Sequence, residues 1–145
     1  MIEVYFGVGC FWHVQHEFVK AEKAFLGRSD AELTSLTGYA GGNRLGSNSN
    51  LPQLGQSVVC YHNMQGVADY GKMGHGEVVR VKIPAKMFEA FASVYLSLFD
   101  KKGDRPDRND RGGEYRHMIG LPGGQDSKEF KVLENLIQTN KSPLQ

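Results

Sequence analysis

Residues 2–12 have the sequence Ile2-Glu3-Val4-Tyr5-Phe6-Gly7-Val8-Gly9-Cys10-Phe11-Trp12. Strand-forming residues fill the first half of this stretch, and two glycines then interrupt the run. Beyond them, apolar residues recur at helical spacing, at Phe11, Val14, Phe18, Ala21 and Phe25. The stretch therefore predicts a strand, a tight glycine turn and a helix, with Cys10 where the helix begins.

Cys10 is the candidate nucleophile of the chain. The unpaired N–H groups and the positive dipole end of a first helical turn favour a thiolate, which is the nucleophilic form of cysteine. Phe11 and Trp12 beside it would form flat apolar walls, which suit an apolar group of a substrate. A buried, inert cysteine among core aromatics explains the same pattern. This stretch alone leaves both interpretations open.

The composition describes an ordinary globular chain. It has 145 residues, of which 40% are hydrophobic and 23% are charged, so we expect one domain over residues 1–145 with one hydrophobic core. The formal net charge is only +1. Because so small a charge gives no large field, we expect neither a nucleic acid nor a membrane as a partner. A monomer is the default expectation, because nothing in the sequence reads as an extended apolar patch.

The two cysteines, Cys10 and Cys60, are far apart and form no C-x-x-C pair. This spacing argues against a structural zinc site and against the disulfide framework of small secreted proteins. No stretch approaches the roughly 20 apolar residues of a membrane span, and no targeting segment is visible. We therefore expect a cytoplasmic protein in a reducing environment.

Strands and helices alternate irregularly along the rest of the chain. Further strands are expected over residues 33–39, 77–83 and 115–121. Further helices are expected over residues 84–100 and 127–137, and long loops over 41–55, 62–74 and 101–114. This mixture predicts the α+β class: a two-layer sandwich in which helices pack on a mixed, mainly antiparallel sheet, with long irregular loops.

Glu77 is the candidate acid. In the strand expected over 77–83, Val79, Val81 and Ile83 share one face, and by parity Glu77 points the same way. A carboxyl group among apolar side chains loses hydration, which favours the protonated form, and such a group can deliver a proton. The alternative is a glutamate at the strand edge that reaches water.

No metal site is predicted. His75 and Glu77 spell H-x-E, the first half of a zinc-deaminase signature, but the P-C-x-x-C half is absent. Asp104, Asp107 and Asp110 lack the spacing of a calcium loop. The charged run over 105–116 has the composition of a solvated, salt-bridged loop. Its Tyr115, however, carries a phenol that suits a polar oxygen in an apolar pocket.

Five segments together resemble the methionine sulfoxide reductase A family, over residues 4–119. They occur in the family's order: Gly9-Cys10-Phe11-Trp12, Gly38-Tyr39-Ala40-Gly41-Gly42, Val59-Cys60, Gly74-His75-Gly76-Glu77-Val78-Val79 and Asn109-Asp110-Arg111-Gly112-Gly113-Glu114-Tyr115-Arg116. Each motif is modest on its own. The first, second and fourth in one short chain are hard to reach by accident.

The resemblance implies thiol-dependent reduction of methionine S-sulfoxide, free or in proteins, in the repair of oxidised proteins. It implies that Cys10 attacks the sulfur and becomes a sulfenic acid while Glu77 protonates the oxygen. Phe11 and Trp12 would hold the substrate's methyl group. The resemblance also assigns the sulfoxide oxygen and neighbouring polar atoms to Asp110 and Tyr115.

The chain departs from the family pattern near the site. His13 and Gln15 stand where relatives commonly have Gly and Glu, and Glu114 replaces a Gln. Gln56 stands where many relatives have a tyrosine that helps to hold the sulfoxide oxygen. Residues 61–73 form a longer connection than usual. Tyr70, near Glu77 in the sequence, is our hypothesis for the substitute tyrosine.

Regeneration of Cys10 needs a second thiol. No cysteine follows Cys60, whereas many relatives carry resolving cysteines in a C-terminal tail. Cys60 is one route, and an external thiol such as thioredoxin, glutaredoxin with glutathione, or dithiothreitol is the other. We favour the external route, because the cysteine aligned with Cys60 is not the resolving one in most relatives. The expected partners are thus peptides or proteins containing methionine sulfoxide and a thioredoxin-like reductant, with no bound cofactor.

Two other functions compete with this interpretation. A protein that binds oxidised methionine without turnover would not need both Cys10 and Glu77, although both are present. A cysteine hydrolase needs a histidine base oriented by a third group. His13, His16 and His75 are available, but none lies in a recognisable hydrolase signature.

Overall fold

Four strands form one sheet in the computed structural model, which describes residues 1–55 and 57–139. The spatial order is β2-β3-β1-β4. The strands are β1 (Ile2–Gly7), β2 (Leu36–Ala40), β3 (Gly76–Ile83) and β4 (Met118–Gly120). All three pairings are antiparallel, so the expected mixed sheet is corrected to an antiparallel one. Only the connection between β2 and β3 joins neighbouring strands, whereas the chain crosses over one strand between β1 and β2 and between β3 and β4.

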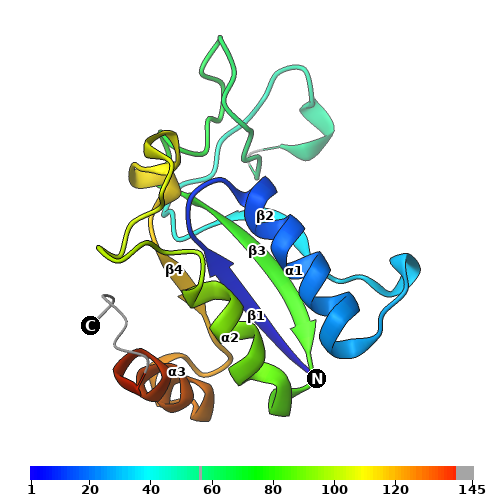
Figure 1. Cartoon of the computed structure of the whole chain (residues 1–145). Coiled ribbons are helices and arrows are strands. Elements are labelled where there is room, and N and C mark those ends of the chain that lie inside the picture. Colours follow the sequence, from blue (N-terminus) through cyan, green and yellow to red (C-terminus); the bar gives the residue numbers. More distant parts are fainter. Residues whose placement is uncertain (56, 140–145) are drawn as a thin grey trace.

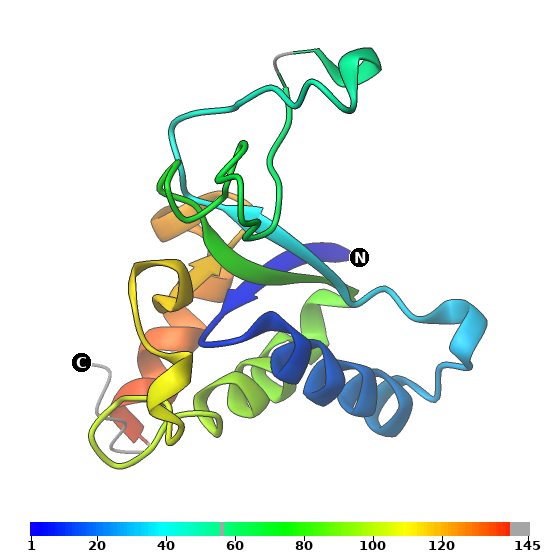
Figure 2. The ribbon, with the colours of Figure 1, turned by 90° about the horizontal axis from the view of Figure 1, so that it is seen from above.

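Three helices accompany the sheet: α1 (Phe11–Leu26), α2 (Phe88–Leu96) and α3 (Lys128–Thr139). Figure 1 shows α1 and α2 lying along the sheet, with α3 beside α2. In Figure 2 the helices lie on one side of the strands. The α+β class expected from the sequence is confirmed.

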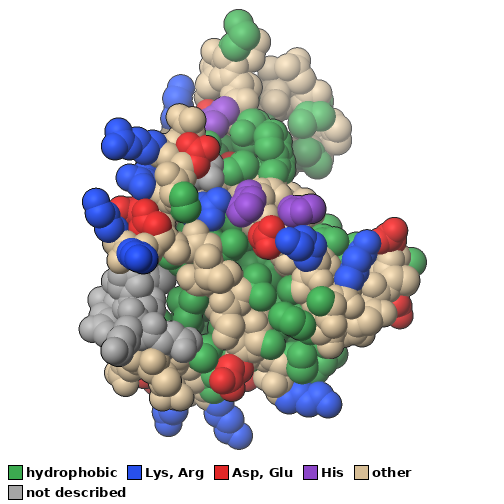
Figure 3. All heavy atoms as spheres, in the orientation of Figure 1, with side chains coloured by type: hydrophobic (Ala, Val, Ile, Leu, Met, Phe, Trp, Pro, Cys, Tyr) green, Lys and Arg blue, Asp and Glu red, His purple; other side chains and the backbone are tan. Residues whose placement is uncertain are grey.

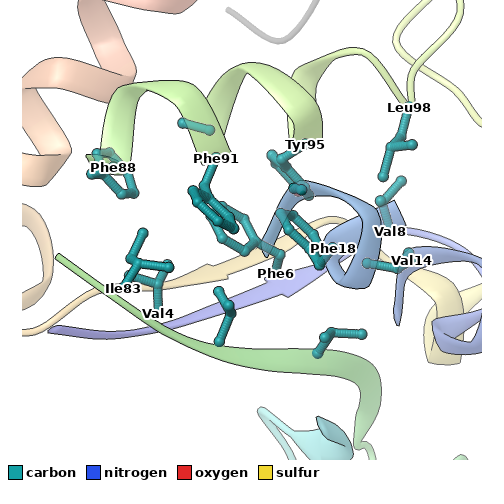
Figure 4. Close-up of a cluster of buried hydrophobic side chains, with 14 of the residues drawn as sticks. Val4, Phe6, Val8, Val14, Phe18, Ile83, Phe88, Phe91, Tyr95 and Leu98 are labelled. Carbon is teal, nitrogen blue, oxygen red and sulfur yellow. The ribbon is translucent and has the colours of Figure 1, made fainter. Parts of the chain in front are cut away.

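The hydrophobic core lies between the sheet and the helices (Figure 4). Alternate residues of the central strands point into it, and the rings of Phe6 from β1 and Phe18 from α1 stack with centroids 4.6 Å apart. Phe91 of α2 extends this stack from Phe18 at 6.1 Å. The core positions α1 firmly against β1 and β3, and the end of α1 that holds Cys10 is thereby fixed.

Two predicted elements differ from the structure. The helix after Pro84 begins as a 3-10 turn, Ala85–Met87, and α2 itself ends at Leu96. It does not extend to Asp100, because the Asp100 carboxylate accepts the N–H groups of Lys102 and Asp104 and forms a loop. The strand expected over 115–121 is limited to β4.

Tyr115 ends a 3-10 turn, Gly113–Tyr115, and does not enter a strand. The Arg116 guanidinium donates to the carbonyl of Gly113 at 2.8 Å and to that of Gly74 at 2.9 Å. These bonds hold residues 113–116 as a turn against the start of β3.

Residues 41–55 and 57–75 project beyond one end of the sheet, as both ribbon views show. One backbone bridge joins the two loops, between Gly46 and Val58. A second bridge, between Cys60 and Asp69, lies within the second loop. Among the described residues, no helix combines the length and the apolar character that crossing a membrane requires.

Candidate active site

Cys10 occupies the N-cap of α1. Gly7 ends β1 where an added side chain would collide with the carbonyl of Glu77, 2.8 Å from the ideal Cβ position. Gly9 then adopts φ 64°, the left-handed conformation that glycine tolerates best. Cys10 has the extended φ and ψ of a cap residue, and its side chain makes no capping hydrogen bond. Its half-buried thiol therefore lies beside the positive end of the helix dipole.

Glu77 meets the same helix end from β3. Only 1% of it is exposed, and it shares the core-facing side of the strand, as the alternation predicts. Its Oε1 accepts the N–H of Phe11 at 2.9 Å, and its Oε2 accepts the Tyr70 hydroxyl at 2.6 Å. The carboxyl group thus lies against the peptide that follows Cys10.

Four tyrosines surround this carboxyl group. Burial and then the hydrogen bond to Glu77 raise the pKa of Tyr70. Burial and then the Coulombic interaction with the Glu77 carboxyl group raise the pKa of Tyr39 to about 12. The same two causes raise the pKa of Tyr61 and of Tyr115. All four phenols therefore keep their protons at neutral pH and can donate hydrogen bonds.

An aromatic wall borders Cys10. Phe11 is buried and Trp12 is largely exposed, with ring centroids 6.2 Å apart. Tyr61 stacks on both, at 6.3 Å from Phe11 and 5.9 Å from Trp12. The charge of Cys10 also contributes to the raised pKa of Tyr61, after burial and Glu77. Thiol, carboxyl group and aromatic rings therefore share one region.

The segment that carries Tyr61 and Tyr70 is held by ionisable side chains. His62 Nδ1 lies 2.8 Å from Asp69 Oδ2, and its Nε2 lies 3.9 Å from Glu114 Oε1. The His62 ring packs on Tyr70 at 4.6 Å. Burial raises the pKa of Asp69, but the hydrogen bonds from His62 and from two backbone amides leave it below its usual value. Asp69 is thus a carboxylate that fixes the loop.

His75 has a structural position. Its Nδ1 accepts the N–H of Gly42 at 3.1 Å, so Nε2 carries the proton that faces the carbonyl of Arg44 at 2.8 Å. A Cβ on Gly42 would lie 2.5 Å from the imidazole ring. The last glycine of the G-Y-A-G-G motif, Gly42, is therefore required where the loop packs on His75, and both nitrogens of the His75 ring are occupied.

The structure brings together most of the residues singled out in the sequence. Cys10, Phe11, Trp12, Glu77 and Tyr70 lie at the N-terminus of α1, and the Tyr115 hydroxyl interacts with that of Tyr70. Tyr115 is also tied to the glycine turn, since its carbonyl accepts the Gly9 N–H at 3.1 Å. Asp110 ends the 3-10 turn Arg108–Asp110, and its side chain lies outside the described residues.

Cys60 is half-buried on the loop beside Tyr61. Its sulfur lies 3.9 Å from the Asn48 side-chain amide, and its backbone pairs with Ala68 and Tyr70. The described residues contain no group of three or more His, Cys, Asp or Glu arranged to hold a metal ion.

Sequence reasoning missed Tyr39 and Tyr61. Tyr39 stands opposite Glu77 in the β2–β3 register and stacks on Tyr70 with centroids 4.5 Å apart. Pairing the strand expected over 33–39 with that over 77–83 would have placed Tyr39 near Glu77. The sequence of either strand alone, however, does not determine the pairing register.

Comparison with solved structures finds the methionine sulfoxide reductase A of Corynebacterium diphtheriae. The TM-score is 0.55 at 17% identity, covering 97% of this chain and 57% of that one. This likeness concerns the fold. Comparison with curated proteins finds the peptide methionine sulfoxide reductase MsrA of Xanthomonas oryzae pathovar oryzae, 29% identical over 121 residues. No family model matches the chain.

The fold and the site define an α+β protein with a cysteine at a helix N-terminus beside a buried carboxyl group. The sequence match to the curated relative covers 82% of the chain. The chain is thus similar to methionine sulfoxide reductases A, in sequence to the Xanthomonas oryzae protein and in fold to the Corynebacterium diphtheriae protein. It spans 45% of the length of the curated relative and just over half of the solved one.

Proposed function

We propose that the protein reduces methionine S-sulfoxide to methionine with Cys10 as nucleophile and Glu77 as proton donor. The observation that carries the proposal is the meeting of Cys10 and Glu77 at one helical turn, through the hydrogen bond from the Phe11 N–H to Glu77. A nucleophile and a proton source must reach opposite ends of one S=O bond, because an unprotonated oxide is too basic to leave.

The electron balance of the reaction requires the thiolate to be oxidised. The Cys10 thiolate sulfur would attack the sulfoxide sulfur and form an S–S bond, while the oxygen takes a proton from Glu77. The hydroxyl group would then pass to the Cys10 sulfur as the S–O bond and the new S–S bond break, so the methionine sulfur keeps two electrons, Cys10 becomes a sulfenic acid, and Glu77 regains a proton from solvent. Each Glu77 oxygen accepts one hydrogen bond in the structure and retains a second lone pair that can carry the transferred proton.

The surrounding side chains would bind the substrate. Phe11 and Trp12 would hold the methyl group, and the hydroxyls of Tyr70 and Tyr115 would orient the oxygen. Tyr70 thereby supplies the hydroxyl for which Gln56 offers no equivalent. Asp110 would help to bind the polar atoms of the substrate near the sulfoxide oxygen.

The activity is tested with the separated S and R epimers of methionine sulfoxide and dithiothreitol, with methionine measured by chromatography. We expect turnover of the S epimer only. Cys10→Ser should abolish it, and Glu77→Gln should lower kcat by about 10²- to 10⁴-fold. Cys60→Ser serves as the control and should retain turnover. Tight binding of the sulfoxide without methionine formation would instead indicate a non-catalytic binding protein.

Hydrolysis receives less support from the site. His75 is the histidine nearest to Glu77 in the sequence, and both of its ring nitrogens are engaged by backbone groups. His13 and His16 are exposed on α1. Ester hydrolysis that disappears in Cys10→Ser would nevertheless restore the hydrolase interpretation.

An external thiol would regenerate Cys10. The sulfenic acid condenses with one thiol to give a mixed disulfide and water, and a second thiol releases Cys10. A single turnover without reductant, followed by intact mass, tests this route. Gain of one oxygen is the expected result. Loss of two hydrogens would show a Cys10–Cys60 disulfide and make Cys60 the resolving thiol.

A further inference from the structure

His62 lies between two carboxyl groups that come from different segments of the chain. Its Nδ1 is 2.8 Å from Oδ2 of Asp69, on the same loop, and its Nε2 is 3.9 Å from Oε1 of Glu114, in the 3-10 turn Gly113–Tyr115. Figure 3 shows histidine and acidic side chains on the surface near the projecting loops. We call His62, Asp69 and Glu114 together the imidazole clamp.

The three side chains of the clamp converge around Gly71. A Cβ added at Gly71 would lie 3.2 Å from Cε1 of His62 and 3.3 Å from Oδ1 of Asp69. The Cβ of Glu114 is 3.9 Å from the same point. The Gly71 N–H also donates to Oδ1 of Asp69 at 2.9 Å. A glycine at this position therefore leaves room for the clamp to close.

Tyr70 lies between the clamp and the carboxyl group of Glu77. The ring of His62 packs on the ring of Tyr70 with centroids 4.6 Å apart. On the other side, the Tyr70 hydroxyl donates to Oε2 of Glu77 at 2.6 Å. Because Tyr70 is fully buried and directly follows Asp69 in the chain, a change in the clamp moves the loop that carries this hydroxyl.

The ionisation of His62 changes the strength of the clamp. A protonated imidazole donates from both nitrogens and carries the charge that pairs with Glu114, whereas a neutral one keeps only the donor to Asp69. Histidine in proteins changes its charge between about pH 5 and 8. Tyr61 and Tyr70 also pack on the ring, and their phenols stay protonated over this interval because burial raises the pKa of both. Alkaline pH therefore weakens the clamp at Glu114 and leaves the bond to Asp69.

We infer that His62 is a positioning residue for the proposed reduction, because the imidazole clamp holds the Tyr70 hydroxyl on Glu77. The inference rests on the proposed function and adds a residue to its site. A hydroxyl that is already fixed beside the proton donor needs no reorganisation when a sulfoxide oxygen binds. His62 itself touches neither Cys10 nor the reacting atoms, and it acts through Tyr70.

The first test is His62→Phe, which keeps a ring on Tyr70 and removes both nitrogen donors. We expect kcat for methionine S-sulfoxide, with dithiothreitol as reductant, to fall about tenfold while KM is unchanged, because the hydroxyl is misplaced but still present. His62→Asn keeps a donor near the position of Nδ1 and should recover most of kcat. His16→Phe, at an exposed position of α1, is the matched control and should behave as the unmodified protein does.

A double-mutant cycle shows whether His62 acts through Tyr70. In a Tyr70→Phe background, His62→Phe should lower kcat by less than about twofold, since the hydroxyl that it positions is already absent. Unfolding of the loop would instead raise KM in both backgrounds, because the ring of Tyr61 would leave Phe11 and Trp12. Such a rise in KM would overturn the inference.

Glu114→Gln tests the second carboxyl group of the clamp. Its kcat, divided by that of the unmodified protein, should be about two- to threefold below one at pH 6 and equal to one at pH 8.5, because the ion pair exists only while His62 is charged. This ratio removes the titrations of Cys10 and Glu77, which both proteins share. A ratio that does not change with pH would overturn the assignment of Glu114 to the clamp.

The outcomes separate this inference from the function on which it rests. If the unmodified protein forms no methionine, the proposed reductase is rejected and the inference with it. If the unmodified protein turns over and His62→Phe has the same kcat and KM as His16→Phe, the inference alone is overturned.

Discussion

Glu77 connects two parts of the chain through two different oxygens. One oxygen accepts a backbone N–H at the start of α1, and the other accepts the phenol of Tyr70 from the 61–73 segment. The backbone of Tyr70 is itself fixed, since its N–H donates to Cys60 and its carbonyl accepts the His75 N–H. These hydrogen bonds hold the Glu77 carboxyl group in one position. Because each of its oxygens has a donor, the glutamate can be buried in this small core.

Replacing Tyr70 by Phe removes that hydrogen bond and leaves the ring. We expect kcat for methionine S-sulfoxide to fall by about 10²-fold, because one preorganised donor next to the reacting oxygen is lost. Tyr39→Phe is the control, since it also removes one phenol from the stack around Glu77. Measured with dithiothreitol at neutral pH, equal effects of the two substitutions would contradict a special position for Tyr70.

The site was only partly predictable from the sequence. Cys10 and Glu77 emerge from local patterns, a glycine turn before a helix and the parity of one strand. Tyr61 and the contact between His62 and Asp69 lie in a loop without periodicity, and their positions depend on tertiary contacts with α1 and Glu114. Side chains in such loops carry no spacing signal that a single sequence can reveal.

At the scale of elements, Glu22 joins α1 to the chain that leads into β2. It is fully buried and accepts the N–H groups of Thr34 and Ser35, both of their hydroxyls and the Arg28 guanidinium. Arg28 in turn donates to the carbonyl of Lys82 in β3 at 2.7 Å. Burial raises the pKa of Glu22, but these hydrogen bonds together hold it below its ordinary value. One carboxylate therefore fixes helix, loop and strand.

Glu22→Gln is expected to lower the free energy of unfolding by about 2–4 kcal/mol at pH 7, because several buried donors lose a charged acceptor. Since the folded-state pKa is lowered, this contribution is present above the ordinary value of 4.5 and is lost as pH falls through the folded-state value. The difference between the two proteins should thus be smaller at pH 3 than at pH 7. Urea unfolding at both pH values measures it.

Glu17→Gln on the same helix is the control for this prediction. Glu17 pairs with Lys20 at 3.4 Å on the surface. Its replacement should therefore lower the free energy of unfolding by less than about 1 kcal/mol. A Glu22→Gln protein as stable as this control at pH 7 would show that the buried network contributes little.

Periodicity predicts the helices and strands well where one face of the element packs on the core, because burial then fixes the spacing of the apolar residues. The helix from Phe11 and the strand that carries Val79 and Val81 match their expected ranges closely. The strand expected from Tyr115 was wrong at its start, because the Arg116 guanidinium binds two carbonyls and folds the backbone into a turn. Such a side-chain contact with a distant carbonyl outweighs local strand propensity.

On the scale of the whole molecule, the three helices and the sheet share one hydrophobic cluster. Residues from β1, β3, α1, α2 and α3 belong to it, and the core stack runs from Phe6 through Phe18 to Phe91. The expectation of one domain over residues 1–145 stays a prediction.

We expect residues 1–145 to unfold in one cooperative transition. Elements that share a core lose their contacts together, so the calorimetric and van 't Hoff enthalpies should agree. The heat-capacity change of unfolding should be about 2 kcal/mol/K, from the average of about 12–15 cal/mol/K per residue.

Two spectroscopic probes test whether the site and the core unfold together. The fluorescence of Trp12, which is 63% exposed beside the site loops, reports on the site, and far-UV circular dichroism reports on the helices. Coincident melting curves would show that site and core form one unit, whereas a separate early change in Trp12 fluorescence would show that the loops open before the core does.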